Sequence, residues 1–174
     1  MGLIKYLKKV RKMDRKRKTL NSLSQNLSTY SLIVFFLFSS FCGVRTKPGK
    51  VWNLRDKIVT LSKSLTGLPY RYGGDDINGF DCSGLVSYVY GCFGIEVPRT
   101  AKKQGKLKNK IKFKNARPGD ILVFKLKRRR WHSGILINKK HFIHAPNRET
   151  PVREEYLSSY WRSHLRAVIR IIDE

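Results

Sequence analysis

The chain has 174 residues, a hydrophobic fraction of 41% and a formal net charge of +25. That length predicts one folded domain with a tail rather than two domains. The three cysteines are an odd number, which excludes a complete disulfide framework, and the positive charge favours anionic partners such as nucleic acid, anionic lipid or an anionic cell envelope. A role in solubility and nonspecific attraction explains that charge as well as a specific anionic partner does.

The N-terminal region joins a basic segment to a short apolar run. Residues 1–18 hold nine Lys or Arg side chains and one acidic residue, and an apolar run at residues 32–38 precedes small residues and Cys42. This order is typical of a bacterial export signal, whereas a bilayer-spanning helix needs about 20 apolar residues. We therefore expect residues 1–44 to be an export signal or a lipoprotein signal with its anchor on Cys42, in preference to a nucleic-acid arm. Translation from Met1 or from Met13 fits the pattern.

Residues 45–50 are a linker by composition, and residues 51–174 are expected to form the folded domain. Apolar residues at helical spacing predict an amphipathic helix that covers residues 51–65. A glycine-rich, aromatic loop follows. A second helix is expected to begin at Cys82, because the apolar side chains after it recur at helical spacing and Asp81 offers a capping oxygen.

The thiol of Cys82 therefore lies at a helix N-terminus. Unpaired backbone N–H groups and the positive end of the helix dipole favour a thiolate there, so we expect this thiol to ionise well below the ordinary pKa of about 8.5. Cys92 follows the same helix without a polar neighbour and is expected to be a small buried hydrophobic residue.

The second half of the chain predicts mostly strands. The basic segment 102–114 is expected to be a solvated loop, with an anion-binding surface as the alternative. A turn at 117–120 precedes an apolar strand at 121–124, and residues 125–130 form a hairpin tip. Two histidine-bearing strands, a helical segment at 154–161 and a last strand at 167–172 complete the prediction. Helices first and strands later indicate an α+β domain with an antiparallel sheet.

Two histidines are candidates for a base. His132 and His144 lie in short β-branched and aromatic runs joined by a turn at 138–140, so they are expected on neighbouring strands. With Cys82 they can form a nucleophile, a base and an orienting group. A zinc site of the same three residues lacks close ligand pairs and a fourth ligand, so no metal or cofactor is expected. His141 and His164 are expected to be surface or structural residues.

Six motifs occur in a fixed order: Tyr70-Arg71-Tyr72-Gly73-Gly74, Gly79-Phe80-Asp81-Cys82-Ser83-Gly84-Leu85-Val86, Pro98-Arg99-Thr100-Ala101, Pro118-Gly119-Asp120, His132-Ser133-Gly134-Ile135 and Phe142-Ile143-His144-Ala145. Through them the chain resembles the NlpC family of cell-wall cysteine peptidases from about residue 51 to residue 172. The resemblance implies a papain-like α+β fold, with helices packed on a central antiparallel sheet. It also implies hydrolysis of amide bonds in peptidoglycan stem peptides, typically between γ-D-glutamate and a diamino acid.

The resemblance also assigns roles to single residues. Cys82 matches the nucleophile, His132 the base and His144 the orienting third residue. Matches to the stem-peptide site are Tyr70, Asp81 and Ser83, although a plain helix cap explains Asp81 equally well. Ser133 and the strongly basic tip at 125–130 depart from the family pattern.

The expected partners follow from this resemblance and from the charge. They are peptidoglycan stem peptides and, through the basic surface, anionic envelope polymers; specific nucleic-acid binding is not expected. The protein is expected to be an exported monomer in the periplasm or at the cell surface, held at the membrane only by a lipid on Cys42. The alternative function is a noncatalytic envelope-binding protein that keeps the fold and uses its basic surface.

Overall fold

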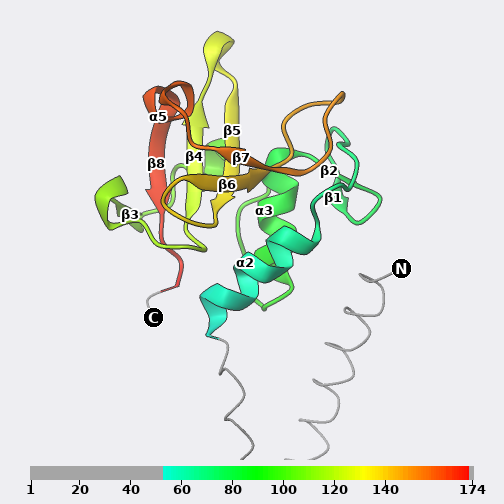
Figure 1. Ribbon diagram of the computed structural model, residues 1–174, viewed down its shortest axis with the longest axis horizontal. Helices are drawn as coiled ribbons and strands as arrows, with labels where there is room; N and C mark the ends of the chain where they lie inside the picture. Colours follow the sequence, from blue (N-terminus) through cyan, green and yellow to red (C-terminus); the bar gives the residue numbers. More distant parts are fainter. Residues whose placement is uncertain (1–52, 173–174) are drawn as a thin grey trace, which may run out of the picture. The chain divides into compact units, whose positions relative to one another are not determined.

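The computed structural model of the chain describes residues 53–172 (Figure 1). The expected export signal with Cys42 and the linker at 45–50 lie outside the described residues. No helix within residues 53–172 is long and apolar enough to cross a membrane.

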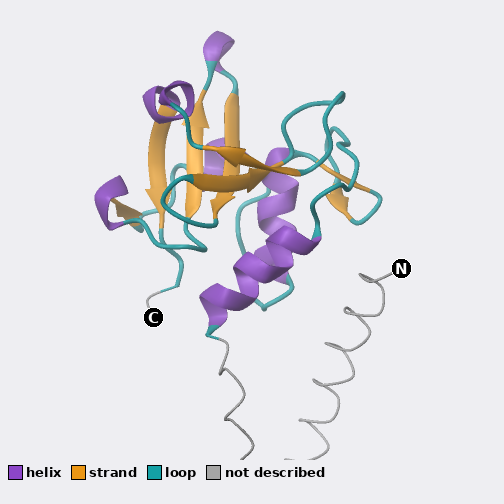
Figure 2. Cartoon of the chain, viewed as in Figure 1, coloured by secondary structure: helices purple, strands orange, loops and turns teal. Residues whose placement is uncertain are grey.

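Most of the helices come before most of the strands along this region (Figure 2). The helices are α2 (Leu54–Ser64), α3 (Cys82–Gly91), α4 (Ala101–Gln104) and α5 (Ser159–His164), with 3-10 turns η1 (Phe113–Asn115) and η2 (Lys127–Arg129). The strands are β1 (Asp75–Asp76), β2 (Gly79–Phe80), β3 (Lys110–Ile111), β4 (Ile121–Lys125), β5 (Trp131–Leu136), β6 (His141–His144), β7 (Arg153–Tyr156) and β8 (Leu165–Ile169).

The main sheet has six antiparallel strands in the order β3-β8-β4-β5-β6-β7. This arrangement confirms the predicted α+β class. The predicted helix from Cys82, the strand at 121–124 and the hairpin tip at 125–130 are also observed, the tip as η2 between β4 and β5. The helix predicted at 51–65 is observed as α2, which begins at Leu54 after the capping residue Asn53 and ends at Ser64.

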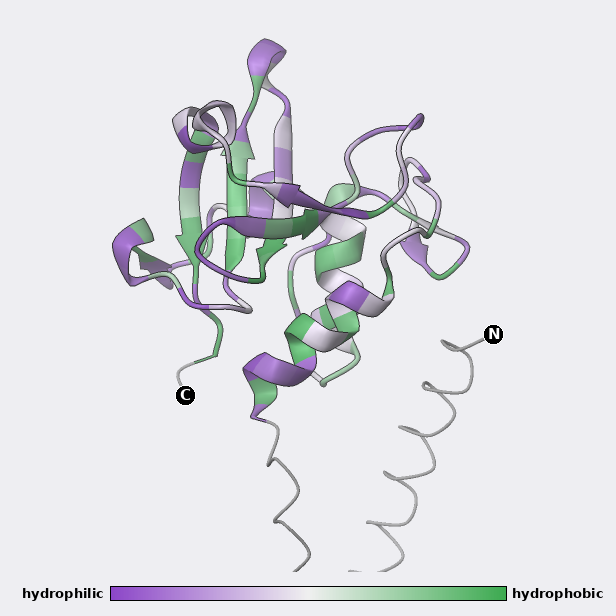
Figure 3. Cartoon of the chain, viewed as in Figure 1, coloured by the Kyte–Doolittle hydropathy of each residue, from purple (hydrophilic) through white to green (hydrophobic). Residues whose placement is uncertain are grey.

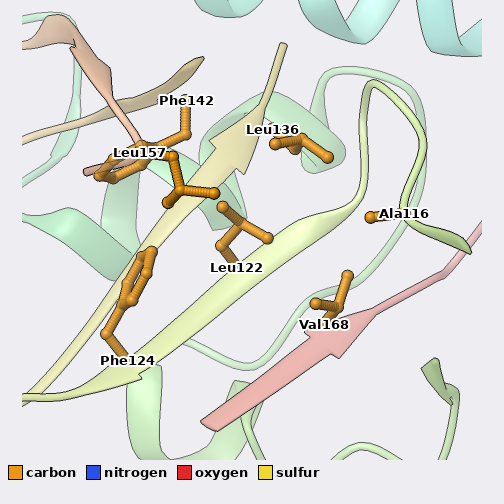
Figure 4. Close-up of a cluster of buried hydrophobic side chains, with 7 residues drawn as sticks. All are labelled: Ala116, Leu122, Phe124, Leu136, Phe142, Leu157 and Val168. Atoms are coloured by element: carbon orange, nitrogen blue, oxygen red, sulfur yellow. The ribbon is translucent and has the colours of Figure 1, made fainter. Parts of the chain in front are cut away.

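Both faces of the central strand are covered. Residues 121–124 of β4 are all fully buried, and Figure 3 shows this strand as hydrophobic. Because side chains alternate across a strand, burial of every residue requires packing on both sides. Helix α3 packs against β5, and α5 contacts β4. On the α5 side, Trp161 packs on a core cluster drawn in Figure 4: Ala116, Leu122, Phe124, Leu136, Phe142, Leu157 and Val168.

A buried carboxylate ties the two ends of the domain to the start of β4. Asp120 accepts hydrogen bonds from Arg55 on α2 (3.0 Å), from Arg170 after β8 (2.9 Å) and from the backbone N–H of Arg117 (2.8 Å). A buried carboxylate is costly unless it is paired and hydrogen-bonded, as it is here. The Pro118-Gly119-Asp120 motif therefore joins distant parts of the fold.

Strands β5 and β6 pair only at Ile135–Ile143 and Leu136–Phe142. Figure 1 shows β6 running across the direction of β4 and β8. Gly134 allows β6 to pass this close, because a Cβ at that position would lie 2.6 Å from the carbonyl oxygen of Ile143 and 3.2 Å from Cβ of His144. The absent side chain lets the two histidine strands approach each other.

Three predictions about the ends of elements are wrong. The segment 154–161 is not one helix: Arg153–Tyr156 forms β7 against β6, and α5 begins only at Ser159. The last strand lies at Leu165–Ile169 rather than 167–172. Cys92, the residue after α3, is exposed rather than buried. A Cβ on the preceding Gly91 would meet no atom within 4 Å beyond its chain neighbours and its own helix, so no other element covers this end of α3 closely.

Candidate active site

A cleft of about 680 Å³ opens where the start of α3 meets the start of β5. Its walls come from the loop after α2, the segment before α4, the β4–β5 tip and the loop after β6. Five of the predicted site residues line it: Tyr70, Asp81, Cys82, Ser83 and His132. His144 is fully buried behind His132. The structure thus brings all six predicted site residues of the domain into one region, and neither His141 nor His164 lines the cleft.

Asp81 caps helix α3. Its Oδ1 accepts hydrogen bonds from the backbone N–H of Gly84 (2.7 Å) and from the hydroxyl of Ser83 (3.0 Å). The guanidinium of Arg99 binds both carboxylate oxygens, at 2.9 and 2.8 Å. Burial raises the pKa of this carboxyl, but the bonds from Arg99 and Gly84 outweigh it and hold the pKa below its ordinary value. The helix-cap interpretation of Asp81 is therefore confirmed, and the cap also lines the cleft.

Arg99 is a site residue that sequence reasoning did not select. Besides Asp81, it donates to the carbonyl oxygen of Gly74 (3.1 Å) and lies 3.4 Å from the carboxylate of Asp75. It thereby joins the glycine-rich loop to the start of α3. The signal for it was present, because Arg99 belongs to one of the six motifs, but the motif gave it no chemical role.

The two histidines are in direct contact. Nε2 of His132 lies 2.7 Å from Nδ1 of His144, with the rings nearly perpendicular. The indole of Trp161 packs against both rings, with centroids 5.4 and 5.2 Å away. Burial lowers the pKa of both imidazoles, because removal from water disfavours the charged form; the charge of Arg130 adds to this for His132. Both rings are therefore neutral in the resting protein.

The prediction of a low thiol pKa is wrong. Burial raises the pKa of Cys82, and the neighbouring Asp81 carboxylate raises it further. Hydrogen bonds from the backbone N–H groups of Ser133 and Ser83 lower it, but they do not overcome burial. His132, which lines the same cleft, is neutral, so the resting protein holds a thiol and an imidazole there rather than a preformed ion pair.

The rim of the cleft is basic. Lys102 and Arg130 line it in addition to Arg99, whereas Asp81 is its one acidic lining residue among those described. Tyr72 also lines it and is 81% exposed. The sequence could not single out Lys102 or Arg130, because each is one cation in a long basic run. All seven lysines of the 102–114 segment are exposed, as the solvated interpretation predicts. The segment is not a loop throughout, however, because it holds the end of α4, strand β3 and η1.

Within residues 53–172, no three His, Cys, Asp or Glu side chains are grouped as metal ligands would be. The site as described therefore consists of a thiol, two neutral imidazoles and a capped helix start on the wall of a basic cleft. A thiol beside a neutral imidazole can attack an electrophilic carbon while the imidazole takes its proton.

Comparison with known proteins places the chain in a family. The family model for the NlpC/P60 family matches residues 67–170. The chain is 36% identical over 110 residues to the gamma-DL-glutamyl hydrolase of Bacillus subtilis, covering 60% of this chain and 27% of that protein. It is 27% identical over 121 residues to the murein DD-endopeptidase MepS/murein LD-carboxypeptidase of Escherichia coli, covering 69% of this chain and 64% of that protein.

A solved structure shows the same fold. The NlpC/P60 family protein from Bacillus cereus superposes with a TM-score of 0.64 at 25% identity, over 68% of this chain and 40% of that one. The chain thus spans between about a quarter and two thirds of the length of these relatives.

Proposed function

Because the chain belongs to the NlpC/P60 family, we propose that it is a peptidoglycan endopeptidase that works through a cysteine acyl-enzyme. The bond that it hydrolyses is the amide between γ-D-glutamate and a diamino acid of the stem peptide. The observation that carries the proposal is the placement of Cys82, at the capped start of α3, in the same cleft as a neutral His132 that contacts His144. The relatives that act on γ-glutamyl or murein bonds support the substrate class.

The chemistry follows from the resting charges. His132 takes the thiol proton as Sγ of Cys82 attacks the carbonyl carbon, and the backbone N–H of Cys82 stabilises the oxyanion. Collapse of this intermediate breaks the C–N bond, and His132 returns the proton to the leaving amine. Water, deprotonated by His132, then attacks the thioester and releases the thiol and a free carboxylate. Tyr70, Asp81 and Ser83 line the substrate side of the cleft, and the cations of the rim attract a peptide that carries carboxylates.

A defined stem tetrapeptide tests this function. The wild-type protein is expected to split L-Ala-γ-D-Glu-diamino acid-D-Ala into two dipeptides, identified by mass spectrometry. Cys82→Ala is expected to reduce turnover to background, because no other group of the cleft can form the thioester. Cys92→Ala is the matched control, since that exposed cysteine lies outside the cleft and its loss should leave turnover unchanged. Products that result from cleavage of a different bond would contradict the proposed cleavage site but not the acyl-enzyme mechanism.

The noncatalytic alternative gives the opposite result. A basic protein that only holds anionic envelope polymers would bind peptidoglycan in a salt-dependent way, release no peptide, and behave identically with Cys82→Ala. Sedimentation with purified peptidoglycan, assayed together with peptide release, separates the two functions.

We also propose that the protein is exported and tethered to the membrane by a lipid on Cys42. The basis is the sequence pattern of residues 1–44. Acyl chains hold a protein in a membrane through a salt wash, whereas attraction of a basic domain to anionic surfaces is screened at about 1 M salt, where the Debye length is about 3 Å. The native protein is expected to stay in the washed membrane fraction, and Cys42→Ser to be released. Equal release of both would refute the lipid anchor, and recovery of the native protein only from the cytosol would refute export.

A further inference from the structure

Three buried side-chain polar atoms have no hydrogen-bond partner within residues 53–172: Gln104 Oε1, Ser133 Oγ and Nε2 of His144, the last of which belongs to a predicted site residue. The closest charged acceptor is Oε2 of Glu155, 3.6 Å away on strand β7. Strands β6 and β7 are paired, with Phe142 opposite Glu155, so the backbone holds this carboxylate beside the His144 ring. A buried N–H that lacks an acceptor is costly, so an unpaired atom aimed at a carboxylate is an observation that needs a reason.

The tautomers of the two rings supply that reason. If His132 takes a proton from Cys82, one of its ring nitrogens must carry a lone pair toward the thiol. Nε2 of His132 is engaged with His144, so the acceptor is Nδ1, and in the neutral ring the hydrogen is on Nε2. That hydrogen is donated to Nδ1 of His144. The hydrogen of the neutral His144 ring is then on its Nε2, which faces Glu155.

We propose that Glu155 is a positioning residue at the end of a relay that runs from Cys82 through His132 and His144. Its carboxylate accepts the Nε2–H of His144, fixes the tautomer of both rings, and leaves the lone pair of His132 directed at the thiol. When His132 gains the thiol proton, the negative charge of Glu155 stabilises the resulting cation through the ring between them. This inference rests on the proposed function, because it assigns His132 the role of base.

The resting distance leaves room for this contact. A separation of 3.6 Å exceeds a hydrogen bond by a few tenths of an ångström. Glu155 is only partly buried, at 23% exposed, so a small rotation of its side chain can close the gap. In the resting state Arg153 binds the same oxygen, with its Nε at 2.7 Å. Arg153 and His144 therefore compete for one carboxylate.

This competition provides a matched control. Glu155→Ala and Arg153→Ala both destroy the Arg153–Glu155 ion pair on β7, but only the first removes the carboxylate from His144. If Glu155 merely braced β7, the two variants would behave alike. Glu155→Gln is the third variant, because its amide oxygen can still accept the hydrogen bond but carries no charge.

The first measurement does not depend on substrate. Nitrogen NMR of histidine-labelled protein distinguishes a ring nitrogen that bears hydrogen from one that does not. In the wild type, Arg153→Ala and Glu155→Gln, we expect the hydrogen of both rings on Nε2. In Glu155→Ala we expect a mixture of tautomers. An unchanged spectrum in Glu155→Ala, or the same mixture in Arg153→Ala, would overturn the proposal even if the protein proved to have no peptidase activity.

The second measurement is the pH dependence of stem-peptide hydrolysis. Glu155→Ala is expected to lower kcat about tenfold or more with little change in KM, as loss of a group that orients a catalytic imidazole does elsewhere. Its acid limb should move to lower pH, because His132 loses a stabilising negative charge; in Arg153→Ala it should move to higher pH. The other charged groups near His132 are Arg130 and Asp81, and all variants keep both. Acid limbs that move in the same direction in both variants would contradict the relay.

Discussion

Replacing His132 with alanine is expected to slow stem-peptide hydrolysis by about 10³-fold, because general-base catalysis of this kind contributes about 10²–10⁴-fold. The resting thiol is neutral, since burial raises the pKa of Cys82, so the attacking thiolate forms only as a base takes its proton. His144→Ala should be milder by about tenfold, because an orienting group fixes the aim of the base without moving the proton itself. Hydrolysis rates of the two variants and of Cys82→Ala, measured with the same tetrapeptide, show which substitution reduces activity most.

Thermal unfolding provides the control for these variants. His144 is fully buried and His132 nearly so, so alanine leaves a cavity at either position and lowers stability. Comparing rates well below both melting temperatures separates a chemical loss from unfolding. If His144→Ala were as inactive as Cys82→Ala while His132→Ala kept its activity, the assignments of base and orienting group would be reversed.

The sequence identified the site because its pieces have local signals. A capping aspartate before Cys82 and apolar residues at helical spacing after it predict α3, and these contacts span only a few residues. The strand-turn-strand pattern predicts His132 and His144 as neighbours for the same reason, because a short turn forces antiparallel pairing. Each element is specified by residues that lie close together in the sequence.

What the sequence did not show depends on contacts between distant segments. Segment 153–156 contains two glutamates, which favour helix, yet pairing with β6 makes it a strand. The carboxylate of Glu155 was therefore not expected beside His144. The thiol pKa was predicted wrongly because the helix start is visible in the sequence, whereas the burial that outweighs it is created by the surrounding loops and strands.

Two glycines of the same helix are expected to respond in opposite ways to alanine. A Cβ on Gly84 would lie 2.0 Å from the carbonyl oxygen of Gly74, a backbone atom that cannot rotate away. Forcing extra atoms into a packed site costs about 3 kcal/mol, which corresponds to a fall of about 10 °C in melting temperature. A Cβ on Gly91, at the exposed end of α3, would meet no atom within 4 Å beyond its chain neighbours and the backbone of its own helix. Gly91→Ala should therefore raise stability slightly, by about 0.5 kcal/mol, because alanine is the better helix former.

The Gly84 variant should also lose activity in the fraction that stays folded. Relief of the clash requires the start of α3 to move away from the loop that carries Gly74, and that carbonyl oxygen also accepts hydrogen bonds from Arg99 (3.1 Å) and from the backbone N–H of Asp81 (2.9 Å). A shift of about 1 Å at a reacting group can cost about 10²-fold in rate, and Cys82 is the first residue of the displaced helix. Melting curves and tetrapeptide hydrolysis of both variants test this. Equal stability and activity in Gly84→Ala and Gly91→Ala would show that the loop does not fix the position of the thiol.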